Sequence, residues 1–165
     1  GRHYRCIREG LDVKISMGEA RVKQGPQWDF FSGASFYADV GNQHVIFLAD
    51  QLPDSHLLLP MIQQSFADWQ HYNLGFLARD THRSVVYERG VGFTESCGSG
   101  AIAAAMTLWL DGDRRAEYQI HQPGGTIKVM LNPLLSSLTD ATFSVVQSGE
   151  AEEVFHGSLV LKSKG

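Results

Sequence analysis

Residues 87–110 read YERGVGFTESCGSGAIAAAMTLWL, a charged pair followed by glycines, one cysteine among small residues, and a long apolar segment. Alanine and leucine are strong helix formers, and residues 101–110 are apolar on nearly every face, so we predict a buried helix there. Ser96 or Ser99 is expected to cap its N-terminus. Cys97 then lies just before the helix, where unpaired N–H groups and the helix dipole favour an anion.

This position suggests two chemical roles for Cys97. The N-terminal end of a helix lowers the pKa of a thiol, so we expect the thiolate of Cys97 to form more readily than that of a free cysteine. The N–H groups of Gly98, Ser99 and Gly100 are placed to hold a carboxylate beside the sulfur, and the glycines allow close approach. The alternative is a small, inert cysteine buried at a tight turn. The chain contains neither GxGxxG nor GxxxxGK[ST], so no motif predicts nucleotide phosphate binding.

Residues 88–92 (ERGVG) and 97–101 (CGSGA) resemble the second cysteine motif of the diaminopimelate epimerase family. That family needs no cofactor and uses two cysteines, one from each half of a pseudo-symmetric chain, to remove and return the α-proton on opposite faces. The resemblance implies an amino-acid epimerase that interconverts LL- and meso-diaminopimelate, with Cys97 as one of the two thiols. It also implies an α+β fold in which antiparallel and mixed strands curl around one buried central helix, here residues 101–110.

The composition suits a soluble globular protein and argues against several classes of partner. Of 165 residues, 43% are hydrophobic and 19% are charged, and the formal net charge is −4 without a lysine or arginine cluster, so no nucleic-acid partner is expected. The apolar runs are too short for a membrane helix and the polar start is not typical of a signal peptide, so the cytoplasm is the expected location. The histidines and cysteines show no metal-ligand spacing, so no metal is predicted. The resemblance to the family implies that no cofactor is needed.

The first 25 residues are interpreted as an inter-lobe strand and linker, and residues 26–165 as the C-terminal lobe. Residues 11–17 alternate apolar and polar side chains, which predicts a strand that Gly18 should end. The same segment resembles the strand that leads from the first half of the family into the second. We therefore expect an N-terminal lobe with the other cysteine as the partner of this chain. Cys6 lacks the Gly-Asn-Gly that follows the family's first cysteine and is interpreted as an incidental thiol.

Two shorter segments extend the resemblance. Residues 41–44 (GNQH) are similar to the family's GNPH, in which the asparagine binds substrate and the histidine lies near a catalytic cysteine; this points to Asn42 and His44, with Gln43 in place of the proline. Asn73 matches a further asparagine that contacts substrate in the family. Without the resemblance, His44 is more simply a structural histidine and Asn73 a turn residue.

The resemblance assigns a role to each polar residue of the expected site. A strand over residues 84–87 delivers the charged pair that follows it, which on its own would be a surface ion pair of small value. Glu88 is expected to take the α-amino group and to act with Cys97 and His44 in catalysis. The expected binding residues are Gly98 and Ser99 for the α-carboxylate, and Arg89, Asn42 and Asn73 for the distal end of the diaminopimelate substrate.

The C-terminal third predicts further strands. Residues 118–130 alternate apolar and polar side chains on either side of Pro-Gly-Gly, which predicts a hairpin, and residues 141–146 predict another strand. Residues 149–157 resemble the family's closing motif, whose aromatic residue, here Phe155, helps to form a homodimer. Phe93 stands where the family usually has glutamate and is expected to place an apolar ring close to the site.

Outside the central helix, residues 54–69 predict an amphipathic helix with apolar side chains at helical spacing. Two alternatives to the epimerase stay open. One is another isomerase of the same fold, proline-racemase-like or phenazine-biosynthesis-like, against which the ERGVG and GNQH segments argue. The other is an inactive lobe, a binding or structural remnant, and it is distinguished by whether a second cysteine-bearing half accompanies this one.

Overall fold

The computed structural model describes residues 4–151, 154 and 156–158, so Phe155 lies outside the described residues. Within these described residues, two α-helices and one short 3₁₀ turn accompany the strands. The helices are α1 (Ser55–Ser65) and α2 (Gly98–Asp111), and the turn is η1 (Trp69–His71). The strands are β1 (Arg5–Glu9), β2 (Asp12–Gln24), β3 (Ala34–Asp39), β4 (Gln43–Ala49), β5 (Asn73–Ala78), β6 (Ser84–Glu88), β7 (Gly92–Thr94), β8 (Glu117–Gln122), β9 (Gly125–Ser136) and β10 (Asp140–Glu150).

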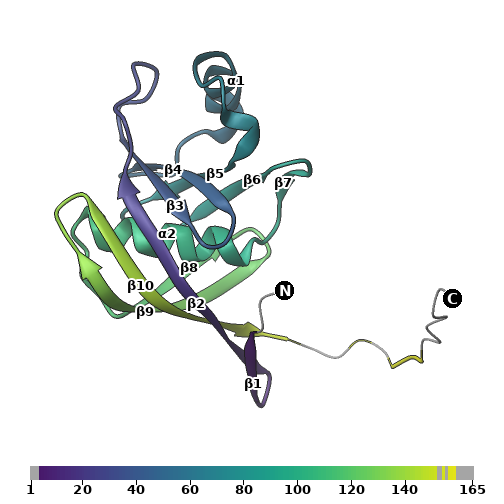
Figure 1. The fold of residues 1–165 in the computed structure, drawn as a ribbon. Coiled ribbons are helices and arrows are strands. Elements are labelled where there is room, and N and C mark those ends of the chain that lie inside the picture. Colours follow the sequence, from purple (N-terminus) through teal and green to yellow (C-terminus); the bar gives the residue numbers. More distant parts are fainter. Residues whose placement is uncertain (1–3, 152–153, 155, 159–165) are drawn as a thin grey trace, which may run out of the picture.

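One sheet curls around helix α2 (Figure 1). Its order is β7-β6-β5-β4-β3-β2-β10-β9-β8, with β1 paired to β2 outside this path; the β4–β5 pair is parallel and the other pairs are antiparallel. The two ends of the sheet approach each other through a bridge between Arg83 and His121, and the His121 N–H donates to the His82 carbonyl at 3.0 Å. The predicted α+β fold, with mixed strands curled around a central helix, is confirmed.

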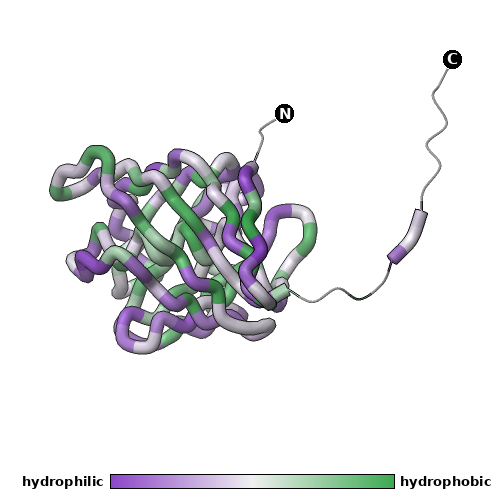
Figure 2. The backbone as a smooth tube through the Cα atoms, turned by 90° about the horizontal axis from the view of Figure 1, so that it is seen from below, coloured by the Kyte–Doolittle hydropathy of each residue, from purple (hydrophilic) through white to green (hydrophobic). Residues whose placement is uncertain are grey.

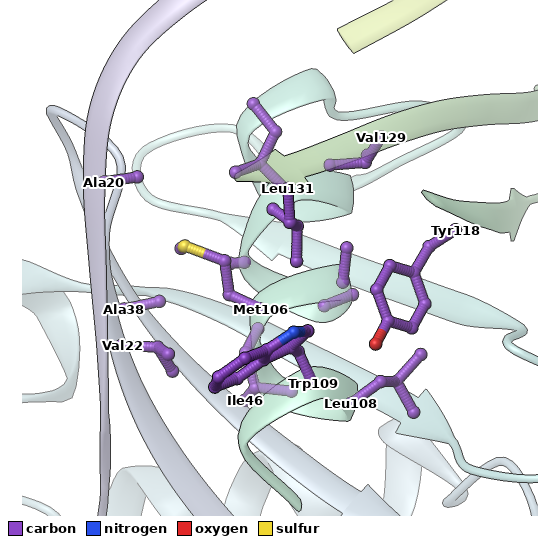
Figure 3. Packing of buried hydrophobic residues seen from close by; sticks show 14 of the residues in the cluster. Ala20, Val22, Ala38, Ile46, Met106, Leu108, Trp109, Tyr118, Val129 and Leu131 are labelled. Carbon is purple, nitrogen blue, oxygen red and sulfur yellow. The ribbon is translucent and has the colours of Figure 1, made fainter. Parts of the chain in front are cut away.

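Helix α2 is the core of the molecule, because every residue from Gly100 to Leu110 is buried. Figure 3 shows Met106, Leu108 and Trp109 of this helix among buried side chains of the surrounding strands, such as Tyr118 and Val129. The helix predicted over residues 101–110 is therefore confirmed and is slightly longer.

The predicted cap of α2 is wrong. Cys97 is the capping residue, and its Sγ accepts a hydrogen bond from the Gly100 N–H. Ser99 lies inside the first turn, where its hydroxyl contacts His44 and Asn42 instead. Ser96 is exposed and lies one residue before the cap.

Strand β4 separates two hydrophobic clusters, which explains its continuous apolar sequence. Ile46 and Leu48 face helix α2, whereas Val45 and Phe47 face the opposite side. On that second side they pack with Ile62 of helix α1, which lies over the part of the sheet that contains β4 and β5 (Figure 1).

The amphipathic helix is shorter than predicted. Asp54 caps α1 by accepting hydrogen bonds from the backbone N–H groups of His56 and Leu57. The helix ends at Ser65 because Phe66 has an extended backbone (φ −119°, ψ 95°), and only the separate turn η1 follows before β5. No helix within the described ranges is long and apolar enough to cross a membrane.

Gly18 does not end the strand that precedes it, which corrects the prediction. β2 continues from Asp12 to Gln24 because Gly18 adopts a positive φ of 78°, and the pairing with β10 shifts register between Val145 and Val146, opposite this point. A bulge thus absorbs the irregularity. The long strand pairs with β1, β3 and β10, so it joins the N-terminal hairpin to the rest of the sheet.

The predicted hairpin over residues 118–130 is confirmed as β8 and β9, and the strands predicted at 84–87 and 141–146 are confirmed as β6 and β10. In β8 exposed and buried residues alternate strictly, which places Tyr118, Ile120 and Gln122 on the inner face. Figure 2 shows the corresponding mixture of hydrophilic and hydrophobic stretches along the chain.

Candidate functional site

The candidate site lies at the N-terminal end of helix α2. Cys97 has an extended backbone (φ −137°, ψ 107°) and is only 6% exposed. Its Sγ accepts the Gly100 N–H at 3.3 Å and lies 3.6 Å from Ser99 Oγ. A Cβ at Gly100 would approach Val86 Cγ2 to 2.8 Å and Cys97 Sγ to 3.2 Å, so a glycine is needed for the helix to pass this close to the sulfur.

The pKa of Cys97 is raised, which contradicts the prediction that the helix would lower it. Burial of the thiol is the largest cause, because a thiolate inside the protein loses its hydration. The hydrogen bonds from Ser99 and Gly100 favour the thiolate but do not compensate, and the negative charge of Glu88 raises the pKa further. Sequence reasoning weighed the helix terminus alone and missed both the packing around the sulfur and the nearby carboxylate.

His44 stands at the centre of a cluster of polar side chains beside the thiol. Its Nε2 lies 3.1 Å from Ser99 Oγ, 3.2 Å from Asn42 Oδ1 and 3.4 Å from Asn73 Nδ2, and Asn42 Nδ2 donates to Ser99 Oγ at 3.1 Å. The parallel pairing of β4 with β5 puts His44 directly opposite Asn73. The structure thus brings together four of the residues that the sequence singled out.

The His44 imidazole is neutral over most of the pH range, because burial lowers its pKa to about 4. The residue has 0% exposure. Its second ring nitrogen, Nδ1, is buried and has no hydrogen-bond partner among the residues that the structure describes.

Glu88 lies at the end of β6, where the tight β6–β7 turn brings Thr94 back to it. Thr94 Oγ1 donates to Glu88 Oε1 at 2.7 Å, which orients the carboxylate. Sequence reasoning missed Thr94, although the hairpin glycines Gly90 and Gly92, both with positive φ, mark the reversal that places it.

Arg89 lies further out than the other predicted residues. Its backbone N–H donates to Asn73 Oδ1 at 2.8 Å, and its side chain donates to the His71 carbonyl at 3.3 Å. The residue is exposed, so the guanidinium stands at the rim of the site and is open to a further partner.

Phe93 does not place its ring at the site, which corrects that expectation. The ring packs edge-on against Tyr87 with centroids 5.2 Å apart, and it also contacts Phe76 and His56 on the α1 side of the sheet. Successive side chains of a strand point to opposite faces, so Thr94 faces Glu88 while Phe93 faces away.

Gln122 is a buried residue that sequence reasoning missed. Its Oε1 accepts the Cys97 N–H at 2.6 Å and its Nε2 donates to the Cys97 carbonyl at 3.2 Å. The strict alternation of β8 was a usable signal, since it assigns this polar residue to the same face as Tyr118 and Ile120.

A cavity of about 290 Å³ adjoins the N-terminal end of α2. Ser96 and Gln147 contribute polar groups to its lining, and Val13, Ile15 and Ile127 contribute apolar ones. The Gln147 carboxamide packs on the backbone of Gly98, where a Cβ would come within 3.0 Å of Oε1. Within the described part of the chain no group of three or more His, Cys, Asp or Glu side chains is gathered to hold a metal ion.

Comparison with known proteins shows what this chain is similar to. The family model for diaminopimelate epimerase matches residues 36–152. A diaminopimelate epimerase of Legionella pneumophila (strain Corby) is 30% identical, with 93% of this chain and 60% of that protein covered. The enzyme of Bacteroides thetaiotaomicron is 28% identical, with 89% and 55% covered, and that of Stutzerimonas stutzeri is 33% identical, with 75% and 44% covered. This chain therefore spans about half the length of the curated relatives it matches.

A solved structure from Pseudomonas aeruginosa, titled a predicted epimerase, shares the fold, with a TM-score of 0.58 over 93% of this chain and 63% of that one. Its sequence is only 14% identical, so this likeness concerns the fold alone. The family match, by contrast, includes the Cys97 turn together with Asn42, His44, Asn73 and Glu88. On this evidence the chain belongs to the diaminopimelate epimerase family.

Proposed function

We propose that this chain supplies one half of the catalytic site of a cofactor-independent diaminopimelate epimerase, with Cys97 as one of two acid–base thiols. The observation that carries the proposal is the position of Cys97 Sγ beside the first turn of a helix that is buried from Gly100 to Leu110. The N–H groups at this helix terminus can bind a substrate carboxylate close to the thiol.

The α-carboxylate of the substrate is assigned to the N–H groups of Gly98 and Ser99. Both belong to the first turn of α2, whose N–H groups lack intrahelical partners. When the α-proton leaves, negative charge spreads from the α-carbon onto the carboxylate. N–H donors held rigidly in a buried helix then stabilise this charge more strongly than they stabilise the ground state, which accelerates the reaction.

The proton transfer itself falls to Cys97. Its thiolate takes the α-proton, so that the C–H bond breaks as the S–H bond forms. A second thiol on the opposite face then returns a proton to the carbanion and inverts the centre. Because burial and Glu88 raise the pKa of Cys97, its thiolate is a stronger base once formed.

The remaining polar residues are assigned to the ends of the substrate. Glu88, oriented by Thr94, accepts the α-ammonium group, and the exposed guanidinium of Arg89 pairs with the distal carboxylate. Asn42 and Asn73 complete the distal contacts. His44 acts on Cys97 indirectly, through the hydroxyl of Ser99.

The proposal requires a partner, because one thiol reaches only one face of the α-carbon. We assign that partner to a second, cysteine-bearing half of the kind that the greater length of the relatives implies. A homodimer through Phe155 stays a prediction. In D2O, residues 1–165 alone are expected not to invert diaminopimelate, whereas a protein that joins them to such a half should exchange the α-proton and form meso- from LL-diaminopimelate.

Replacing Cys97 by alanine in that two-half protein should abolish turnover while binding is largely retained. Solvent deuterium in the product, followed by mass spectrometry, and chiral separation of the isomers measure both effects. The proposal fails if the folded two-half protein leaves the α-proton in place, or if Cys97→Ala turns over normally. Inversion at speed by residues 1–165 alone would contradict the two-thiol requirement.

The carboxylate assignment has a test in this chain alone. Iodoacetate and iodoacetamide both alkylate a thiolate, forming an S–C bond as iodide leaves, but only iodoacetate carries a carboxylate. The ratio of the two rates therefore cancels the thiolate fraction. We expect this ratio to be about tenfold higher at Cys97 than at exposed Cys6, the effect of one hydrogen bond to a charged group. Equal ratios would exclude the carboxylate cradle.

A further inference from the structure

We propose that Gln122 is a positioning residue for the reactive thiol: its buried carboxamide holds the backbone of Cys97, so that Sγ and the free N–H groups of Gly98 and Ser99 keep one fixed relation. The inference rests on the proposed function for the purpose of that relation. It gives a role to a residue of β8, whereas the other residues of the site lie between Asn42 and Ser99 in the sequence.

The contact is specific, since both polar atoms of one side chain are used on both backbone groups of one residue. Gln122 Oε1 accepts the Cys97 N–H at 2.6 Å, and Nε2 donates to the Cys97 carbonyl at 3.2 Å. Gln122 is 8% exposed and Cys97 is 6% exposed, so water does not readily replace either bond. The Cys97 carbonyl also accepts the Ala101 N–H at 2.9 Å, which ties the same residue to the helix.

The β8–β9 hairpin is attached to this turn at a second point. The Gly124 N–H donates to the Glu95 carbonyl at 2.6 Å, and a Cβ at Gly124 would lie 3.0 Å from that oxygen. Residues on both sides of Ser96 are therefore bound to the hairpin. The loop that carries the thiol is thus held in place by hydrogen bonds to the β8–β9 hairpin.

This attachment decides which donors remain for a ligand. The Cys97 N–H is taken by Gln122, the Gly100 N–H by Cys97 Sγ, and the Ala101 N–H by the Cys97 carbonyl. Gly98 and Ser99 are left as the first-turn N–H groups without a hydrogen-bond partner in the described part of the chain. Gln122 thus favours a single anion position, directly beside Sγ.

The test compares Gln122→Met with Gln119→Met. Methionine fills a similar volume and makes neither hydrogen bond, while Gln119 is an exposed residue of the same strand and serves as the matched control. The readout is the iodoacetate to iodoacetamide rate ratio at Cys97, with Cys6 as internal reference, in protein shown to be folded by circular dichroism. Gln122→Met should lower this ratio by about fivefold, the loss expected when a hydrogen bond to a charged group is weakened. Gln119→Met should leave it unchanged.

The outcomes separate the inference from the proposed function. A merely structural Gln122 lowers the melting temperature but leaves the ratio in the folded protein as it was, and that result overturns the inference alone. Equal ratios at Cys97 and Cys6 in the unaltered chain overturn the carboxylate cradle and the inference with it.

If Gln122→Met does not fold, Gln122→Glu keeps the acceptor for the Cys97 N–H and loses the donor. It should lower the ratio further than Gln119→Glu, and an equal effect of the two overturns the inference.

Discussion

His44 Nε2 lies 3.1 Å from Ser99 Oγ, so a buried imidazole of strand β4 meets the first turn of helix α2 through one hydroxyl group. The same hydroxyl lies 3.6 Å from Cys97 Sγ. A charged imidazolium would be poorly solvated here, because Nε2 contacts amide and hydroxyl groups and the negative charge of Asp39 does not offset the burial of the ring. Because the folded protein keeps this ring neutral, its stability falls at a pH where the unfolded chain protonates the same histidine.

We expect the stability of the chain to fall as the pH drops from 6.5 to about 4, partly because of His44. The folded-state pKa of His44 is lowered to about 4 by burial, whereas its ordinary value is 6.5. Between these values the unfolded chain binds a proton that the folded chain refuses, so stability present above pH 6.5 is lost towards pH 4. The loss is on the order of 3 kcal/mol. Urea unfolding at several pH values measures it.

The matched variants for this prediction are His44→Gln, which cannot titrate, and His71→Gln, at an exposed position. His44→Gln should flatten the slope of the free energy of unfolding against pH in this window. His71→Gln should keep the slope of the unaltered protein. A slope that His44→Gln leaves intact would show that other groups cause the acid sensitivity.

Cys97 is expected to alkylate more slowly than Cys6 near neutral pH, because burial and the Glu88 carboxylate both raise its pKa. Glu88→Gln removes that charge and should move the midpoint of the rate-against-pH profile of Cys97 to lower pH. Glu95→Gln removes an equal charge from an exposed residue two positions before the cysteine and should move it less. Brief iodoacetamide labelling followed by mass spectrometry gives both profiles. A midpoint unaffected by Glu88→Gln would show that the charge of Glu88 does not raise the pKa of Cys97.

Gly100→Ala should destabilise the protein by about 1–3 kcal/mol, although alanine in a helix is normally the better residue by roughly 0.5–1 kcal/mol. The new methyl group would approach Val86 Cγ2 to 2.8 Å. Val86→Ala should therefore reduce the cost of Gly100→Ala, as a double-mutant cycle in urea would measure. Gly149→Ala is the control, since its Cβ would meet nothing within 4 Å. A higher melting temperature for Gly100→Ala would contradict the tight packing.

The local sequence pattern predicted those helices and strands whose own spacing of apolar and polar residues shows which side is buried. The all-round apolar residues of α2 and the alternation on either side of Pro-Gly-Gly are of this kind. What it missed depends on distant partners. Gly18 continues its strand because β10, more than 120 residues later, pairs with β2 on both sides of a bulge in which Met17 of β2 has no partner. The pKa of Cys97 follows from packing and from the Glu88 carboxylate, which a count of helix N–H groups leaves out.

The candidate site was predictable to the extent that family motifs cover it. Asn42, His44, Asn73 and Ser99 come together as one hydrogen-bonded group, although their meeting depends on the register of β4 with β5. The motifs assign no role to Thr94 or Gln122, and only the folded hairpins show what they touch.

Arg89 gives the test of substrate choice. The proposed site pairs its exposed guanidinium with the distal carboxylate of diaminopimelate, and closing a second half over this rim would bury the pair. In a two-half protein, Arg89→Ala should lower kcat/KM for diaminopimelate on the order of 100-fold, since an unpartnered buried charge costs about 3 kcal/mol. The pH profile of Cys97 should change little. Arg83→Ala is the control and should stay near normal, since the exposed Arg83 precedes β6 whereas Arg89 follows it. If Arg89→Ala also stayed near normal, the assignment of diaminopimelate as substrate would fail, whereas the thiol chemistry of Cys97 would stand.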